Sequence, residues 1–268
     1  MHPVLFQFGE FKLHSFGLLL IIAFGAGAWL AAKRAKRFQF DPSKVADLCF
    51  WTLLAGVLGA RVVYILQDLG HYLANPRELL TLQFQGLTSF GGLLFGIGAV
   101  ALFSIRNKRS LLDVADLLAP SMLLGWAIGR IGCLLNGCCY GRICNEAYCV
   151  QAGDSINLHF PAQLIDSGLN LVFFIALLAI ERIGLNKGQS FSLALAFHGL
   201  ARFIYEFFRA GTVEEVKMGI ASSTYWEGLP FPITEAQVAA GTLVVIGMAM
   251  FFAFQRRGMI QQEIRVAS

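Results

Sequence analysis

Seven apolar segments, each long enough to cross a bilayer, dominate this sequence of 268 residues. A helical crossing takes about 20 apolar residues, and every backbone polar group must be paired within the span. The segments cover residues 15–32, 46–66, 87–105, 116–135, 163–180, 190–208 and 234–254. Hydrophobic residues make up 56% of the chain and charged residues only 14%, against about 25% charged residues in soluble domains. The sequence therefore predicts an all-α polytopic membrane protein with seven transmembrane helices.

The distribution of basic residues predicts the orientation of these helices. Basic residues follow the first, third, fifth and seventh segments, namely Lys33, Arg34, Lys36, Arg37, Arg106, Lys108, Arg109, Arg182, Lys187, Arg256 and Arg257. By the positive-inside rule, the N-terminus lies outside and the C-terminus is cytoplasmic. No small-residue cleavage site follows the first segment, so we expect that span to be retained. Because the net charge of +4 resides at span ends, we expect no nucleic-acid partner.

We interpret residues 1–268 as a single integral membrane domain with two external cap segments, 136–162 and 209–233. Both segments are rich in glycine, proline and polar residues. On the predicted topology they lie on the outer face, where chemistry that needs water or a translocated partner would be placed.

Residues 129–142 place an arginine, an asparagine and four glycines at the end of an apolar segment. Burying a charged side chain such as Arg130 in hydrocarbon costs about 2.5–3.5 kcal/mol, so the side chain usually faces a cavity or a ligand. The usual partner of a half-buried arginine is an anion, and the commonest anion in a membrane is a lipid phosphate. This segment therefore indicates a protein that handles a charged lipid headgroup.

The sixth segment carries four polar residues at helical spacing. Arg202, Glu206 and Arg209 are four and three residues apart and share one face of a helix, which His198 extends by one turn. One interpretation is a structural Arg–Glu pair, with Arg209 reaching the interface. The other is an anion site in which the glutamate orients the arginines, and the two can hold together. His198 alone would be interpreted as a buried core residue, but its position beside Arg202 favours a functional role.

Five of the six cysteines fall within 17 residues near the outer end of the fourth segment: Cys133, Cys138, Cys139, Cys144 and Cys149. On an oxidising face, one or two disulfides across the cap are the first expectation. A thiolate metal site and a redox role stay open, but the spacing matches no standard Cys-x-x-Cys pair, and we predict no metal and no cofactor. In the third segment, Gly91, Gly92, Gly96 and Gly98 indicate close helix packing. The alternative is a thinned wall that admits a lipid or a peptide.

Taken together, these motifs resemble the prolipoprotein diacylglyceryl transferase family over nearly the whole chain. The block at 129–132, continued by Asn136-Gly137 and Gly141-Arg142, is similar to the family signature. Residues 116–120 resemble its lead-in. Further blocks are similar at residues 59–61 with Tyr64, at residues 159–164 and at residues 202–209.

The sequence departs from the family pattern at five positions, which indicates a divergent branch. Phe90 stands where the family has a histidine, and Phe16 and His198 stand where it has tyrosines. Cys133 and Cys138 replace an asparagine and a glutamate of the signature.

The resemblance implies transfer of the diacylglyceryl group of phosphatidylglycerol to the lipobox cysteine of a prolipoprotein, in the bacterial cytoplasmic membrane. A thioether forms and glycerol phosphate leaves. Alternatives are a paralogue with the same lipid cavity but another acceptor or donor, and an anionic-lipid transporter. The transporter is disfavoured because no inverted repeat is evident.

The resemblance also implies roles for individual residues. Arg130 and Arg202 would bind the phosphate and stabilise the leaving group, because arginine is always charged and contacts phosphate bidentately. With Phe90 in the histidine's place, His198 is our hypothesis for the acceptor of the thiol proton, although the leaving phosphate could also accept it. The remaining predicted substrate-binding residues are Arg61, Asn136, Gly137, Gly141, Glu206 and Arg209.

Overall fold

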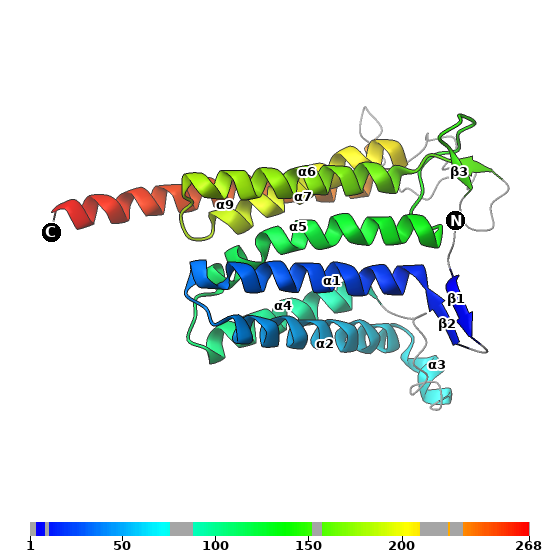
Figure 1. The fold of residues 1–268 in the computed structure, drawn as a ribbon, viewed down its shortest axis with the longest axis horizontal. Helices are drawn as coiled ribbons and strands as arrows, with labels where there is room; N and C mark the ends of the chain where they lie inside the picture. Colours follow the sequence, from blue (N-terminus) through cyan, green and yellow to red (C-terminus); the bar gives the residue numbers. More distant parts are fainter. Residues whose placement is uncertain are drawn as a thin grey trace. The chain divides into compact units, whose positions relative to one another are not determined.

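The computed structural model describes residues 4–8, 11–75, 88–151, 157–209, 225 and 233–267. Long helices make up most of it (Figure 1). The α-helices are α1 (Ser15–Arg34), α2 (Pro42–Gln67), α3 (Leu69–Ala74), α4 (Ser89–Arg106), α5 (Leu111–Asn136), α6 (Ala162–Ile180), α7 (Gln189–Arg209) and α9 (Glu235–Ala267). Two 3-10 turns are η1 (Ala35–Phe38) and η3 (Glu181–Ile183), and four short strands are β1 (Val4–Phe8), β2 (Phe11–His14), β3 (Val150–Gln151) and β4 (Leu158–His159).

Among the described residues, six helices are long and apolar enough to cross a membrane: α1, α2, α5, α6, α7 and α9. A shorter apolar helix covers Phe90–Arg106, where the third span was predicted. Large apolar side chains are exposed along these helices, including Trp51, Leu93 and Val245. An aqueous protein would not expose so many, since they need an apolar surrounding. The chain is an all-α polytopic membrane protein, while its orientation and the number seven stay predictions.

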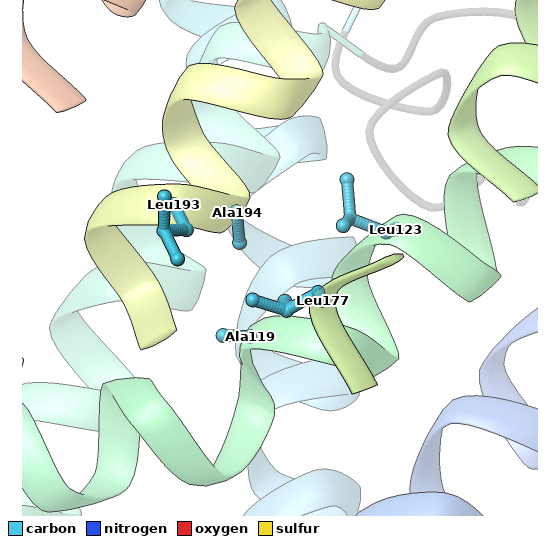
Figure 2. Packing of buried hydrophobic residues seen from close by; sticks show 5 residues of the cluster. All are labelled: Ala119, Leu123, Leu177, Leu193 and Ala194. Atoms are coloured by element: carbon cyan, nitrogen blue, oxygen red, sulfur yellow. The ribbon is translucent and has the colours of Figure 1, made fainter. Parts of the chain in front are cut away.

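The described chain forms two compact units, one from residues 1–30 and 118–268 and the other from residues 31–117. In the larger unit, α7 packs along both α6 and α9 (Figure 1). Its apolar core joins three helices through Ala119 and Leu123 of α5, Leu177 of α6, and Leu193 and Ala194 of α7 (Figure 2). Burial of these side chains fixes the helices that carry the polar residues of the site.

In the smaller unit, α2 and α4 pack through glycines. A Cβ atom on Gly91 would lie 2.4 Å from the carbonyl oxygen of Gly59 and 2.8 Å from Cβ of Val63. A Cβ on Gly92 would lie 3.4 Å from the oxygen of Gly56. Close contact through small residues drives helix association where the hydrophobic effect is absent. The sequence allowed two interpretations of this glycine-rich segment, close helix packing and a thinned wall. The structure shows close packing at Gly91 and Gly92.

Replacing Gly91 with valine should lower the stability of the protein in detergent by about 1–3 kcal/mol, the usual cost of overpacking. The reason is that the new side chain would overlap backbone and Val63 atoms of α2. Thermal unfolding in detergent measures the effect. Gly98→Val is the matched control, since a Cβ there meets nothing within 4 Å. Equal melting temperatures for the two variants would show that the α2–α4 contact is not tight.

An arginine compensates for the proline inside α5. Pro120 has no N–H, so the carbonyl of Asp116 loses its helical partner. Arg34 donates from Nη2 to that carbonyl at 3.2 Å and from Nε to the carbonyl of Leu117 at 3.3 Å. The residue is buried, so its charge is stabilised by these two carbonyl groups.

Strand pairing, a disulfide and hydrogen bonds hold the described part of the cap segment 136–162 in place. Strands β3 and β4 pair antiparallel, with Val150 opposite His159, and lie near the end of α5 and the start of α6 (Figure 1). A disulfide joins Cys144 to Cys149, as predicted for a cap on an oxidising face. His159 is buried and bonds through Nδ1 to the carbonyl of Gly141, so its role here is structural. Most of the second predicted cap segment, 209–233, lies outside the described residues.

Candidate active site

Arg130 is held on α5 by a buried carboxylate and two aromatic rings. Its Nε lies 2.6 Å from Oδ2 of Asp166 on α6, which has no exposed surface. Its guanidinium lies over the rings of Trp126 and Tyr205, at 5.2 and 4.9 Å from the centroids. The Arg130 side chain is only 11% exposed, and a charge so deeply buried needs a partner. Asp166 contacts the Nε side of the guanidinium, so the Nη side is directed to other groups.

Arg202 reaches the same tyrosine from α7. Its guanidinium lies 4.7 Å from the centroid of the Tyr205 ring. Tyr205 is fully buried, and its hydroxyl donates to the carbonyl of Cys139 at 2.8 Å. Cation–π contact and desolvation favour both positions. Both guanidinium groups therefore contact one buried ring.

Glu206 joins Arg202 and Arg209, as their spacing predicted. Oε2 of Glu206 lies 3.0 Å from Nη2 of Arg202, and Oε1 lies 2.8 Å from Nη1 of Arg209. The glutamate is fully buried while both arginines are partly exposed. Three arginines thus share two carboxylates, those of Asp166 and Glu206, and the group keeps one net positive charge. A phosphate is an electrostatic match for that charge.

A second hydrogen-bond chain runs from Asp166 to His198. The Asn170 side-chain amide donates to the carbonyl oxygen of Asp166 at 2.8 Å and to its Oδ1 at 2.7 Å. This orientation turns Oδ1 of Asn170 toward Nδ1 of His198, 3.3 Å away. An amide oxygen can only accept, so His198 carries its proton on Nδ1 and a lone pair on Nε2. Trp126 fixes the imidazole edge-on, with ring centroids 4.4 Å apart. This tautomer leaves Nε2 as the atom that could accept a proton, while the role of His198 as a base stays a prediction.

Asn136 and Gly137 end α5 in a turn that folds the chain back on itself. Gly137 has a φ of 73°, which glycine adopts without strain. The N–H of Gly137 donates to the carbonyl of Leu134, and the N–H of Cys138 donates to that of Cys133, both at 3.1 Å. These two bonds define a Schellman motif. Their effect is to place Cys138 over Cys133, one turn back along α5.

Hydrogen bonding within this turn sets the acidity of one exposed thiol. Hydrogen bonds from the Cys133 and Cys138 thiols lower the pKa of the Cys139 thiol, and the positive charges of Arg130 and Arg209 act in the same direction. Cys139 is exposed, so this thiol is the accessible member of the group. Thiolate character and access together make a cysteine reactive toward metals and electrophiles.

Gly141 allows the cap to approach α7 closely. A Cβ there would lie 2.5 Å from the carbonyl oxygen of Phe208 and 2.9 Å from that of Phe160. The Gly141 N–H donates to the Phe160 carbonyl at 2.9 Å, and the N–H of Arg142 donates to the Phe208 carbonyl at 3.2 Å. Backbone packing is thus sufficient to require glycine here. Its predicted role in substrate binding stays a prediction.

The sequence of the chain matches one family of known proteins. A family model described as "Prolipoprotein diacylglyceryl transferase" matches residues 3–253. The chain belongs to this family. Three relatives named "Phosphatidylglycerol--prolipoprotein diacylglyceryl transferase" match this chain. The relative from Methylibium petroleiphilum is 35% identical, over 77% of this chain and 83% of the relative. The relative from Pseudoalteromonas atlantica is 29% identical (99% of this chain, 94% of the relative), and that from Geobacter sulfurreducens is 30% identical (95% of this chain, 96% of the relative).

As a member of the prolipoprotein diacylglyceryl transferase family, the chain is a transferase. The matches do not favour the alternatives of a paralogue with another acceptor or of an anionic-lipid transporter. Arg61, which the resemblance assigns to substrate binding, lies in the smaller unit beside the rings of Tyr64 and Tyr72, at 5.8 and 5.7 Å from their centroids. Phe90 lies in the same unit and is 68% exposed. The role of Arg61 stays a prediction.

Four residues that organise the site of this transferase, namely Asp166, Asn170, Tyr205 and Trp126, were not predicted from the sequence. Asp166 and Asn170 lie four residues apart in the apolar segment 163–180, and an acidic residue within a span is by default a functional candidate. That signal could have found both residues. Tyr205 and Trp126 carry no comparable signal, because an aromatic residue in a membrane helix is expected for packing alone.

Proposed function

We propose that this chain transfers the diacylglyceryl group of phosphatidylglycerol to the lipobox cysteine thiol of prolipoproteins in the bacterial cytoplasmic membrane. The observation that carries the proposal is a pair of guanidinium groups, those of Arg130 and Arg202. Both contact the ring of Tyr205, and each forms an ion pair with a buried carboxylate. The names of the relatives supply the donor and the acceptor class. The seven-span topology with the N-terminus outside would place the site toward the outer face, where a translocated precursor is available.

The main requirement of the reaction is a site for the phosphate anion, and not a covalent intermediate. The thiol sulfur attacks the carbon of the diacylglyceryl group that is bonded to a phosphate oxygen. The bond between that carbon and the oxygen breaks, and glycerol phosphate leaves. Charge on the leaving oxygens grows as that bond breaks. Arg130 and Arg202 are fixed by Asp166, Glu206 and the Tyr205 ring before substrate arrives, so little reorganisation is needed when the charge develops.

The thiol proton needs an acceptor, because only a few per cent of a cysteine is thiolate near neutral pH. His198 is assigned this role, with Nε2 as the accepting atom and Asn170 holding Nδ1. Asn136, Gly137 and Gly141 would shape the headgroup pocket, Glu206 and Arg209 would orient Arg202, and Arg61 would support the bound substrate.

The direct test is mass spectrometry of a lipobox peptide incubated with the purified protein and phosphatidylglycerol in detergent. A mass increase of one diacylglyceryl group, absent with a peptide carrying serine in place of the cysteine, is the expected result. Arg202→Ala should remove the product, whereas Arg256→Ala, a change at an exposed arginine of α9, should not. A folded wild-type protein that yields no product would contradict the proposal.

His198→Gln is expected to reduce the transfer rate by about 10²- to 10⁴-fold, the usual contribution of a general base. Glutamine keeps a polar group beside Asn170 but cannot accept a proton at neutral pH. The dependence of rate on pH is the specific readout, since the rise with pH caused by deprotonation of the imidazole should vanish in the variant. An unchanged rate would show that His198 is not the proton acceptor and would favour the leaving phosphate in that role.

A further inference from the structure

Three cysteines at the end of α5 meet outside the groups that the proposed reaction uses. The sulfur atoms of Cys133, Cys138 and Cys139, hereafter the cysteine cluster, all lie within 4.8 Å of one another. The Schellman motif at Gly137 brings Cys138 back over Cys133. Cys139 follows with a φ of 60°, a second left-handed residue, which is unusual for a side chain other than glycine or asparagine. Two residues with positive φ, one on either side of Cys138, therefore shape this cluster.

Side chains from two other helices hold the backbone of the cluster in place. Gln163 of α6, fully buried, donates from Nε2 to the carbonyl of Cys138 at 2.7 Å. Tyr205 of α7 donates to the carbonyl of Cys139 at 2.8 Å. These bonds fix the backbone from which the Cys138 and Cys139 side chains extend. The cluster is thus positioned by the tertiary fold and not by the local turn alone.

We propose that the cysteine cluster binds one Zn²⁺ ion through its three sulfur atoms and leaves the fourth position for a thiol of the substrate. A Zn–S bond of about 2.3 Å in tetrahedral geometry separates the sulfurs by about 3.8 Å, which the cluster reaches with small side-chain rotations. Three protein ligands with one open position are typical of catalytic zinc, whereas structural sites have four. Cys133 and Cys138 are partly buried while Cys139 is exposed, which places the open position on the Cys139 side.

The charges around the cluster match a zinc–thiolate group. Zn²⁺ with three thiolates carries one net negative charge. The positive charges of Arg130 and Arg209 act on Cys139, and that of Arg130 also acts on Cys133. Compensation of this kind stabilises an anionic metal group in a partly desolvated place. The arginines therefore favour the metal-bound form of the cluster, and the one net positive charge of their group can balance either this cluster or a bound phosphate, not both.

The proposal deepens the proposed function and rests on it for the identity of the substrate. A thiol that coordinates zinc is deprotonated by the ion's charge. The S–H bond would break on coordination, with the proton passing to His198. The sulfur would then form the S–C bond to glycerol while the C–O bond breaks and its electron pair leaves with the phosphate oxygen. The thioether product has no charge and is a weaker ligand, so it would dissociate.

Metal binding can be tested without the transfer reaction. The protein, reduced and stripped with a chelator in detergent, is titrated with Co²⁺ as the spectroscopic probe. We expect a thiolate-to-cobalt charge-transfer band that saturates at one ion per chain and disappears when Zn²⁺ is added. Loss of a hydrogen-bond partner of a ligand weakens metal binding by about 10- to 100-fold. Cys139→Ser removes a proposed ligand itself and should weaken binding of the ion by more than that. Cys49→Ser, which changes a buried cysteine of α2, is the matched control and should bind as the wild type does.

The outcomes separate this proposal from the proposed function. A wild-type protein that does not bind Co²⁺ or Zn²⁺, or a thiol count showing two of the three cysteines in a disulfide, would overturn the metal site. A lipobox peptide should shift the visible cobalt bands, and its serine analogue should not; no shift with the cysteine peptide would overturn the open thiol position. Metal binding without a diacylglyceryl product would contradict the proposed function and leave the metal site standing.

Discussion

Arg130→Ala is expected to reduce diacylglyceryl transfer by at least about 10²- to 10³-fold, the loss seen when one fixed donor to a developing anion is removed. Arg130 is the residue on which the site converges, since it contacts Asp166, Trp126 and Tyr205. Alanine removes one of the two guanidinium groups beside Tyr205 and leaves Asp166 as a buried carboxylate without that partner. The group around a bound phosphate would then have no net positive charge.

The measurement is the rate of thioether formation under single-turnover conditions, with thermal unfolding in detergent as a check of folding. Arg130→Lys separates charge from shape, because lysine keeps the charge but cannot place a planar fork over the rings of Trp126 and Tyr205. We expect the lysine variant to keep only a small part of the activity. Arg256→Ala is the control for the loss of an arginine. If a folded Arg130→Ala protein kept more than a tenth of the wild-type rate, Arg130 would not contact the leaving group.

Asp166→Ala should destabilise the protein by about 3–5 kcal/mol, because it breaks a buried ion pair by removing one partner. Asp166 is fully buried and accepts hydrogen bonds from Trp126 at 3.3 Å and from Asn170 at 2.7 Å in addition to its pair with Arg130. Its loss leaves Arg130 without its carboxylate and releases the amide that orients His198. Stability and activity should therefore fall together.

Equilibrium unfolding in detergent measures the change, and a double variant identifies its cause. Asp166→Leu combined with Arg130→Met removes both charges, so it should be more stable than Asp166→Leu alone, although inactive. Asp166→Asn keeps the shape and some hydrogen bonds and should cost less than alanine. If the double variant were no more stable than Asp166→Leu, the cost would come from packing and not from an uncompensated charge.

The helices of this protein were predictable because each one is a local consequence of composition. A span must be about 20 residues long and apolar, and the predicted segments 15–32 and 190–208 correspond closely to α1 and α7. The ion pairs of Glu206 were equally accessible, because residues three and four apart on a helix are neighbours whatever surrounds them. One disulfide in the cap was also expected, although the spacing alone did not select Cys144 and Cys149 as the pair.

The contacts that join different helices were not predictable in this way. Asp166 is 36 positions from Arg130 in the chain, and no local rule pairs them. The cysteine cluster shows the same limit, because Cys133 and Cys138 do not have Cys-x-x-Cys spacing and their approach depends on a Schellman turn at Gly137. The dipeptide Asn136-Gly137 after an apolar run is a helix-end signal that could have placed the thiols together.

The sequence by itself thus determined the membrane class, the positions of the spans, the face shared by Arg202, Glu206 and Arg209, and, through its motifs, the family. Only the tertiary structure decided that Arg130 and Arg202 both contact the ring of Tyr205, that Asp166 and Asn170 orient Arg130 and His198, and that three thiols meet at the end of α5. The physical reason is the range of the interactions. Apolar length, helical spacing and turn chemistry act within one element, whereas ion pairs and ring contacts between helices form only after packing has set the distance and rotation of each helix.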